Sequence, residues 1–262
     1  MLSDEIAGWM RDEIDNLEAD GAVIGLSGGV DSAVAAGLIK KAMGDDTLAV
    51  LLPCDGSSSE DEDYARLVAD IYDLDTITID LKGAFGAMEE SFSSQSIPKK
   101  TRDRWPKTAL EIDEPDKDHA LENAKPRIRM MALYYVAERM NYAVIGTSNK
   151  SELLAGYYTN HGDNAADIQP LIDLLKTEVW DLARELGVPE EIIERPPSAG
   201  FYEGQTDEDE LGVSYRTLDR IFGGEADVAD GAPIGEEDIR RANELRAAAA
   251  DKSKDRIFKH ND

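Results

Sequence analysis

The sequence predicts an α/β fold: a doubly wound parallel sheet with helices on both faces. Short apolar runs alternate with longer segments whose apolar residues recur at helical spacing, a pattern typical of β-α-β units. A glycine-rich turn joins the first apolar run to the segment after it, as happens at the ligand-binding edge of such sheets. Neither an internal repeat nor a low-complexity linker divides the 262 residues, so we expect one domain over residues 1–262.

The first part of the chain alternates regularly between helix and strand signals. Ile6, Met10 and Ile14 give the first helix an apolar face. Ser59 and Glu62 have the spacing of a capping box, and Gly44 stands where a helix C-cap is expected. The predicted order is helix Ser3–Leu17, strand Ala22–Leu26, helix Asp31–Met43, strand Thr47–Leu52, helix Ser59–Tyr72, strand Asp75–Asp80 and helix Gly83–Phe92.

A polar segment, Ser93–His119, separates this part from the next helix. It contains the basic stretch KKTRDRWPK, which is either a lid over anionic ligands or an ordinary surface loop. Asn123 is expected to cap the following helix, with Pro126 in its first turn. The predicted elements are then helix Asn123–Met140, strand Tyr142–Gly146, helix Ser151–Tyr157, helix Lys176–Leu186 and helix Ala242–Asp251.

Composition excludes several classes of function. The chain has 55 acidic and 28 basic residues, a net charge of −27, which disfavours binding to nucleic acid or to anionic membranes. The acids are scattered, so we expect a solvated surface adapted to molar salt; the alternative is an ordinary acidic enzyme.

Cys54 is the only cysteine. No apolar run approaches the ~20 residues of a membrane span, and Met1–Asp20 is too charged for a signal peptide, so a cytoplasmic location is expected.

The glycine-rich turn is predicted to bind phosphate. Backbone N–H groups between a strand and a helix N-terminus suit an anion. The turn lacks the Lys of a P-loop and the spacing of the dinucleotide motif. Asp31 would repel phosphates unless a cation intervened, which points to Mg²⁺, although a simple helix cap is the alternative. The loop residues are Gly25, Leu26, Ser27, Gly28, Gly29, Val30, Asp31 and Ser32.

Ser-Gly-Gly-x-Asp-Ser resembles the pyrophosphate loop of the N-type ATP pyrophosphatases. Gly146–Tyr215, beginning GTSNKSELLAGYYTNHGDNAAD, and the stretch NAKPRIRMMALYYVAERM are similar to ammonia-dependent NAD synthetases of that superfamily. The likeness covers Gly25–Tyr215. It implies a Rossmann-type, adenine nucleotide alpha hydrolase-like fold, and the acidic composition adds the expectation of a haloarchaeal source.

The resemblance implies a role for each matching position. ATP would contact the glycine loop together with Thr147, Lys176 and Ser198, and Asp31 and Glu152 would hold Mg²⁺. Deamido-NAD would contact Arg127, Asn160, Asp163 and Asp167, with Asp163 and Lys176 as catalytic residues. Asn160 departs from the Lys that many relatives carry. Lys252-Ser253-Lys254 stands near the usual His-Lys-Arg, which leaves contacts from the chain end open.

The reaction implied by the resemblance has two steps. The nicotinate carboxylate of deamido-NAD attacks the α-phosphorus of ATP and releases pyrophosphate, and ammonia then displaces AMP from the acyl-adenylate. A homodimer is also implied, and free ammonia or a separate amidotransferase is the expected nitrogen source. Two rivals are a tRNA-thiolating enzyme, which generally needs catalytic cysteines and a basic surface, and a nucleotide-binding module without catalysis.

Overall fold

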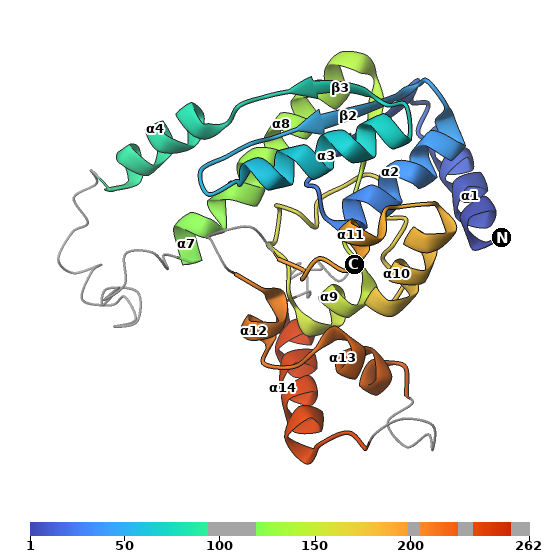
Figure 1. Cartoon of the computed structure of the whole chain (residues 1–262). Coiled ribbons are helices and arrows are strands. Elements are labelled where there is room, and N and C mark those ends of the chain that lie inside the picture. Colours follow the sequence, from blue (N-terminus) through green and yellow to red (C-terminus); the bar gives the residue numbers. More distant parts are fainter. Residues whose placement is uncertain (94–118, 199–204, 225–232, 253–262) are drawn as a thin grey trace, which may run out of the picture.

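A four-stranded parallel sheet forms the centre of the protein, with strand order β3-β2-β1-β4 (Figure 1). The computed structural model describes residues 1–93, 119–198, 205–224 and 233–252. Val23 of β1 pairs with Leu48 of β2 on one side and with Val144 of β4 on the other. The strands are β1 Gly21–Gly25, β2 Thr47–Leu51, β3 Asp75–Thr78 and β4 Tyr142–Ile145.

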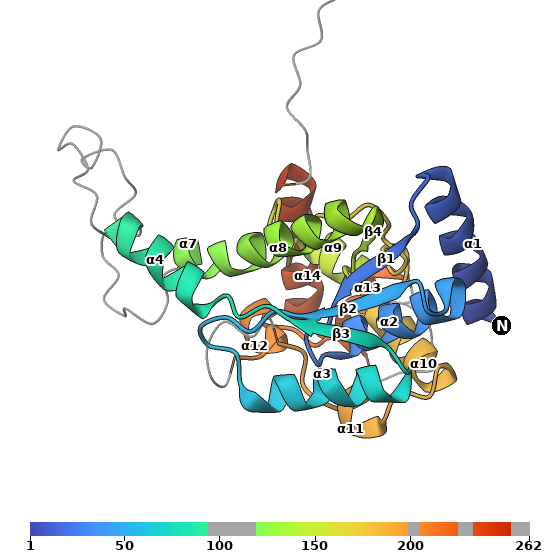
Figure 2. The same ribbon diagram turned by 90° about the horizontal axis from the view of Figure 1, so that it is seen from above.

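Helices cover both faces of the sheet, which confirms the predicted fold class (Figure 2). Because side chains alternate along a strand, Ile24 joins one apolar core and the adjacent Val23 joins the other. The Ile24 core is covered by α1 Leu2–Asn16, α2 Val30–Met43, α3 Ser59–Ile71, α10 Lys176–Glu185 and α11 Glu190–Ile193. The Val23 core is covered by α4 Lys82–Ser93 and α8 Ala124–Met140, and α7 His119–Glu122 precedes α8.

A smaller helical cluster packs beyond the sheet, next to α10 (Figure 1). Tyr215 and Leu218 of α13 are fully buried at its centre. Its helices are α9 Lys150–Ala155, α12 Asp207–Leu211, α13 Tyr215–Phe222 and α14 Glu236–Lys252. The cluster contacts the helices that cover the sheet through α13 and α10.

One predicted helix cap is wrong, and another lacks the expected side-chain hydrogen bond. The cap of α3 is Ser58 and not Ser59: its Oγ accepts the N–H of Asp61 at 3.0 Å. Asn123 is the N-cap residue of α8, as predicted, but its side chain makes no capping hydrogen bond; its Oδ1 instead accepts the hydroxyl of Thr159 at 2.7 Å. The shift at Ser58 reflects three consecutive serines that offer the same cap signal. Asn123 is taken by a residue distant in sequence, which no local pattern reports.

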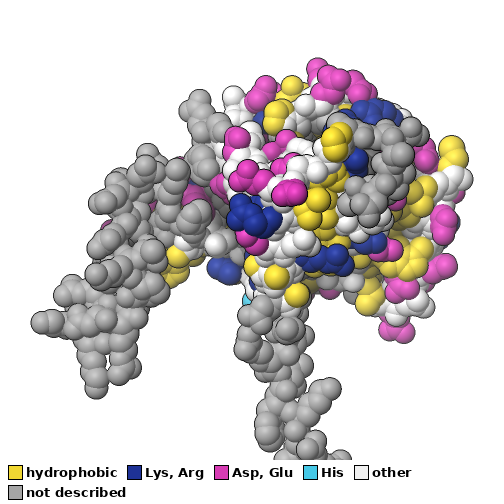
Figure 3. Space-filling model, turned by 90° about the horizontal axis from the view of Figure 1, so that it is seen from below, with side chains coloured by type: hydrophobic (Ala, Val, Ile, Leu, Met, Phe, Trp, Pro, Cys, Tyr) yellow, Lys and Arg dark blue, Asp and Glu magenta, His cyan; other side chains and the backbone are white. Residues whose placement is uncertain are grey.

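On the face seen in Figure 3, acidic side chains are spread among other side chains rather than gathered in one block. None of the helices among the described residues is both long and apolar enough to cross a membrane. Cys54 is buried with a free thiol. The basic stretch Lys99–Lys107 of the predicted lid lies outside the described residues.

The turn after β1 requires glycine at one position. Gly28 has φ +82°, and a Cβ there would lie 2.4 Å from the carbonyl oxygen of Asp61. We therefore expect Gly28→Ala to lower the free energy of unfolding by about 1–3 kcal/mol, measured by urea denaturation. Gly29→Ala is the matched control, because Gly29 has φ −89° and its Cβ would meet only the hydroxyl of Ser27, at 3.4 Å. Equal losses in the two variants would contradict this account.

Candidate active site

A cavity of about 1070 Å³ opens at the carboxyl ends of β1, β2 and β4. Parallel strands bring their following loops together at this edge of a sheet. The glycine loop after β1, Leu52 and Pro53 after β2, and Gly146 and Thr147 after β4 all line it. Of the residues predicted to contact ATP or Mg²⁺, the cavity lining includes Gly25, Leu26, Ser27, Gly29, Val30, Asp31, Ser32, Thr147, Glu152, Lys176 and Ser198.

Hydroxyl groups hold the glycine loop in shape. The hydroxyl of Ser32 donates to the carbonyl of Gly29 at 2.9 Å and accepts the N–H of Ser27 at 3.3 Å. The N–H of Gly29 donates to the hydroxyl of Ser27 at 3.2 Å. Helix α2 starts at Val30, one residue earlier than predicted. Its first-turn N–H groups have no partners within the helix, which makes this end suited to a phosphate.

Lys176 joins the glycine loop to the second half of the chain. Its side chain is almost fully buried, and its Nζ donates to Oδ2 of Asp31 and lies 3.5 Å from Oε1 of Glu152. The Tyr215 ring centroid is 5.2 Å from the same ammonium. Asn149 caps α9 and also donates its Nδ2 to Oδ1 of Asp31 at 2.9 Å. One ammonium and two carboxyl groups thus lie next to the first turn of α2, where the glycine loop ends.

The charges in this cluster shift one another's pKa values. Burial, followed by the nearby Asp31, raises the pKa of Glu152 to about 8. Burial alone would lower the pKa of Lys176, but Asp31 and Glu152 outweigh it and raise the pKa above its usual value. Lys176 therefore stays charged, whereas Glu152 holds its proton until a further positive charge favours the carboxylate.

The two carboxylates fit a magnesium ion. Asp31 and Glu152 both line the cavity, with 18% and 16% of their side chains exposed. Within the described ranges, no group of three or more His, Cys, Asp or Glu side chains is placed to hold a metal. Mg²⁺ is commonly held by one or two carboxylates, with phosphate oxygens and water completing its shell. The donor set present here matches that pattern.

Asp163 is the predicted deamido-NAD residue that reaches the cavity. Burial raises the pKa of Asp163, opposed in part by hydrogen bonding from Thr159, whose N–H donates to Oδ1 at 2.8 Å. A carboxylate in this setting accepts a proton more readily than one in water. Asp163 lies close to Arg129 and Lys252 in the same cavity wall.

The other three predicted residues do not line the cavity within this chain. Arg127 is exposed on α8 and its Nε donates to the carbonyl of Asn160 at 3.1 Å. Asp167 is engaged elsewhere: its Oδ2 accepts the N–H of Val144 at 2.8 Å and its Oδ1 accepts the Tyr134 hydroxyl at 3.2 Å. In the single chain, Asp167 therefore links β4 to α8 through hydrogen bonds.

Three cationic residues that line the cavity were not predicted as site residues: Arg129, Arg195 and Lys252. Arg129 donates its Nε to the carbonyl of Leu52 at 3.2 Å and its Nη2 to the hydroxyl of Ser57 at 3.2 Å. The Arg-x-Arg spacing was the available signal, because residues two apart point to different sides of a helix. Lys252 donates to the carbonyl of Gly156 at 2.8 Å. The resemblance of Lys252-Ser253-Lys254 to the usual His-Lys-Arg was the available signal for this residue.

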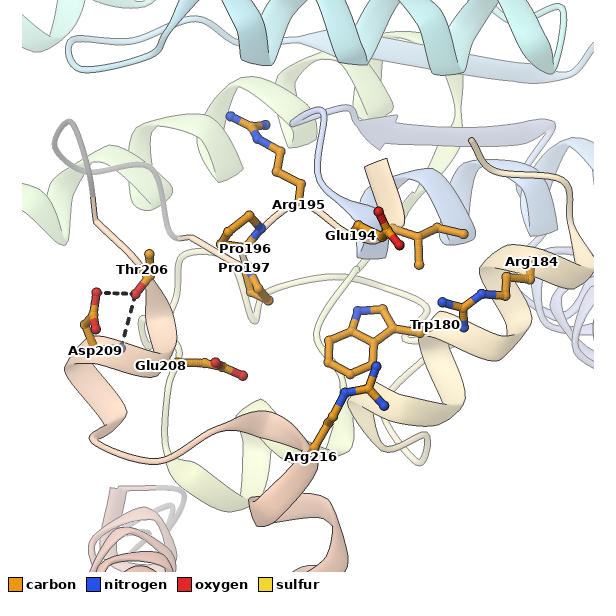
Figure 4. A pocket seen from close by; sticks show the side chains of 11 residues that line it. Trp180, Arg184, Glu194, Arg195, Pro196, Pro197, Thr206, Glu208, Asp209 and Arg216 are labelled. Carbon is orange, nitrogen blue, oxygen red and sulfur yellow. Dashed lines mark hydrogen bonds between the residues drawn. The ribbon is translucent and has the colours of Figure 1, made fainter. Parts of the chain in front are cut away.

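A second cavity of about 540 Å³ lies behind the segment Arg195–Pro197, which lines both cavities. In Figure 4 the Arg195 side chain points away from the stacked pair Trp180 and Arg216. Its Nη2 lies 2.6 Å from Oδ1 of Asp61 on α3. This ion pair links the segment to α3. Ser198, which follows Pro197, lines the main cavity.

Comparison with known proteins identifies the family. The family model of NAD synthase matches residues 2–260. The chain belongs to the NAD synthase family. An ammonia-dependent NAD⁺ synthetase of Carboxydothermus hydrogenoformans is 42% identical over 220 residues, 84% of each chain. The enzyme of that name from Methanocaldococcus jannaschii is 44% identical over 226 residues, 84% of this chain and 79% of the relative.

Solved structures support the same family. The structure of NMN synthetase from Francisella tularensis is similar to this NAD synthase family member with a TM-score of 0.84 and 34% identity, covering 99% of this chain and 98% of that one. The relatives come from varied organisms. They give the fold and the family, and they leave the expected haloarchaeal source as a prediction.

The raised pKa of Glu152 makes stability depend on pH. Its ordinary pKa is 4.5 and its folded-state pKa is about 8, so folding retains a proton between these values and the folded state loses stability as pH rises through them. The Glu152→Gln side chain does not titrate. The free energy of unfolding of this variant, relative to that of the wild type, should therefore rise by on the order of a few kcal/mol between pH 4.5 and 8 and then level off.

Urea unfolding of wild type and variant, both free of metal and nucleotide, measures this difference at each pH. Groups that titrate alike in the two proteins cancel in the comparison. A difference that stays constant from pH 5 to pH 9 would show that Glu152 titrates normally.

Proposed function

We propose that this chain catalyses the ATP-dependent amidation of deamido-NAD with ammonia, giving NAD, AMP and pyrophosphate through an acyl-adenylate. The observation that carries the proposal is the placement of Lys176 against Asp31 and Glu152 at the mouth of the glycine loop. In this arrangement the ammonium of Lys176 can stabilise the negative charge of a departing pyrophosphate. Two relatives more than 40% identical are ammonia-dependent NAD⁺ synthetases, which supports the same activity.

The residues of the cavity divide the work of adenylation. The first-turn N–H groups of α2, at the end of the glycine loop, and the ammonium of Lys176 would stabilise negative charge on the leaving pyrophosphate. Asp31 and Glu152 would hold Mg²⁺, which neutralises phosphate charge when bound. Thr147 and Ser198, which line the same cavity, would contact ATP.

The acceptor is proposed to bind at the other end of the cavity. Asp163 would orient ammonium or take up its proton, in keeping with the raised pKa of its buried carboxyl. Arg127, Asn160 and Asp167 would contact deamido-NAD from outside the single-chain cavity. Arg127 lies on the same stripe of α8 as Met131 and Tyr135, which are 61% and 64% exposed. A second subunit packed on this stripe would complete the substrate site, and we propose a homodimer.

A mononucleotide acceptor is the second candidate. The chain is similar over almost its full length to a structure described as NMN synthetase. Amidation of nicotinate mononucleotide needs the same adenylation of the same carboxylate. The two activities differ only in whether an adenylate moiety extends beyond the nicotinate nucleotide.

Product analysis by mass spectrometry tests the proposal. We expect protein, ATP, Mg²⁺, ammonium and deamido-NAD to give equal amounts of NAD, AMP and pyrophosphate, and glutamine to fail as a replacement for ammonium. Parallel reactions with nicotinate mononucleotide determine the acceptor. Release of ADP and phosphate, or no amide from either acceptor, would refute the proposal. Lys176→Met serves as the inactive control.

The acidic surface leads to a linked proposal about conditions. We propose a cytoplasmic enzyme adapted to molar salt, because two copies with a net charge of −27 each repel one another unless screened. The screening length is about 10 Å at 0.1 M salt and about 3 Å at 1 M. Sedimentation and activity from 0.1 to 3 M potassium chloride should show dimer and activity rising together. A monomer at every salt concentration would refute the dimer, and highest activity at 0.1 M would refute the salt adaptation.

A further inference from the structure

A buried carboxylate outside the cavity connects the two helices that carry the charged cluster. Asp219 lies on α13 and is 4% exposed. It does not line the main cavity. It nevertheless accepts hydrogen bonds from Ser151, next to Glu152, and from Thr177, next to Lys176. Asp219 can therefore affect the geometry of the site without touching a ligand.

The contacts form a short chain of hydrogen bonds. Oδ2 of Asp219 accepts the N–H of Thr177, in the first turn of α10, at 2.8 Å. Oδ1 accepts the hydroxyl of Ser151, in the first turn of α9. The same Ser151 hydroxyl accepts the N–H of Lys176 at 2.9 Å. One carboxylate therefore links the N-termini of α9 and α10.

Helix α10 is only partly capped by its own residues. Its N-cap residue Leu175 has no side chain that can accept a hydrogen bond, and Glu178 accepts only the N–H of Leu175, at 2.7 Å. The first N–H groups of a helix have no partners within it, and a carboxylate near this end also interacts favourably with the helix dipole. Asp219 supplies from α13 the acceptor that the local sequence does not provide.

The bonded positions adjoin the residues of the charged cluster. Ser151 precedes Glu152 and Thr177 follows Lys176, so holding the two N-termini together fixes both side chains relative to Asp31. Tyr215 of the same α13 lies against the ammonium of Lys176. We propose that Asp219 is a positioning residue, which sets Lys176 and Glu152 at the correct separation to bind Mg²⁺·ATP.

The proposal rests on the proposed function for its kinetic test, but nucleotide binding tests it independently. Asp219→Asn keeps the size of the side chain and removes its charge and one acceptor. Partners of this kind, when mutated, typically cost 10–100-fold in metal affinity or activity. We expect calorimetry to show Mg²⁺·ATP binding weakened at least about tenfold and kcat reduced by about 10–100-fold, with the KM for ammonium unchanged.

Asp181→Asn is the matched control, because Asp181 lies on α10 with 83% of its side chain exposed and pairs only with Arg184 among the described residues. It should bind Mg²⁺·ATP as the wild type does. The double variant Asp219→Asn with Ser151→Ala should be no worse than the poorer single variant, because both changes break one connection.

Two results would overturn the inference. One is wild-type Mg²⁺·ATP affinity in a folded Asp219→Asn protein. The other is a loss that follows only the unfolded fraction, measured by circular dichroism on the same sample. If the wild type binds Mg²⁺·ATP but makes no amide, the proposed function fails while the binding comparison still decides the role of Asp219.

Discussion

The buried ammonium of Lys176 between Asp31 and Glu152 is the interaction on which the rest of the site depends. A lysine with almost no exposed side chain is costly unless its charge is balanced, and the Asp31 carboxylate balances it here, with Glu152 beside the pair. The residues come from three separate segments of the chain. Their meeting point brings the glycine loop, α9 and α10 to one edge of the sheet.

The sheet explains how this meeting is achieved. Parallel strands place the loops after β1, β2 and β4 at the same edge. The glycine loop is local to β1 and α2, whereas Lys176 lies on α10, which packs against α2 in the same core. The smaller helical cluster then adds the Tyr215 ring next to the ammonium and Asp219 at the N-termini of α9 and α10. The proposed nucleotide site is thus built from one local loop and residues that are distant from it in the sequence.

Local patterns in the sequence predict the parts of the structure that are themselves local. Alternation of strands and helices gave the fold class, and the Gly28 turn with Asp31 in the first turn of α2 lies where predicted. The partner of Lys176 is 145 residues away, and that of Ser151 is 68 residues away. Nothing in the spacing of residues reports such pairs. The same limit applies to Asn123, whose side chain bonds Thr159 and makes no capping hydrogen bond to α8, and to Asp167, whose bonds to Val144 and Tyr134 follow from packing.

Exchange of labelled pyrophosphate into ATP tests the central claim, that this cluster promotes attack of a carboxylate on ATP. With Mg²⁺·ATP and the acceptor, either deamido-NAD or nicotinate mononucleotide, label should enter ATP without ammonium, because adenylation is reversible and precedes amidation. Lys176→Met should lose the exchange while remaining folded. Exchange that proceeds without any acceptor, that requires ammonium, or that survives in Lys176→Met would contradict the account.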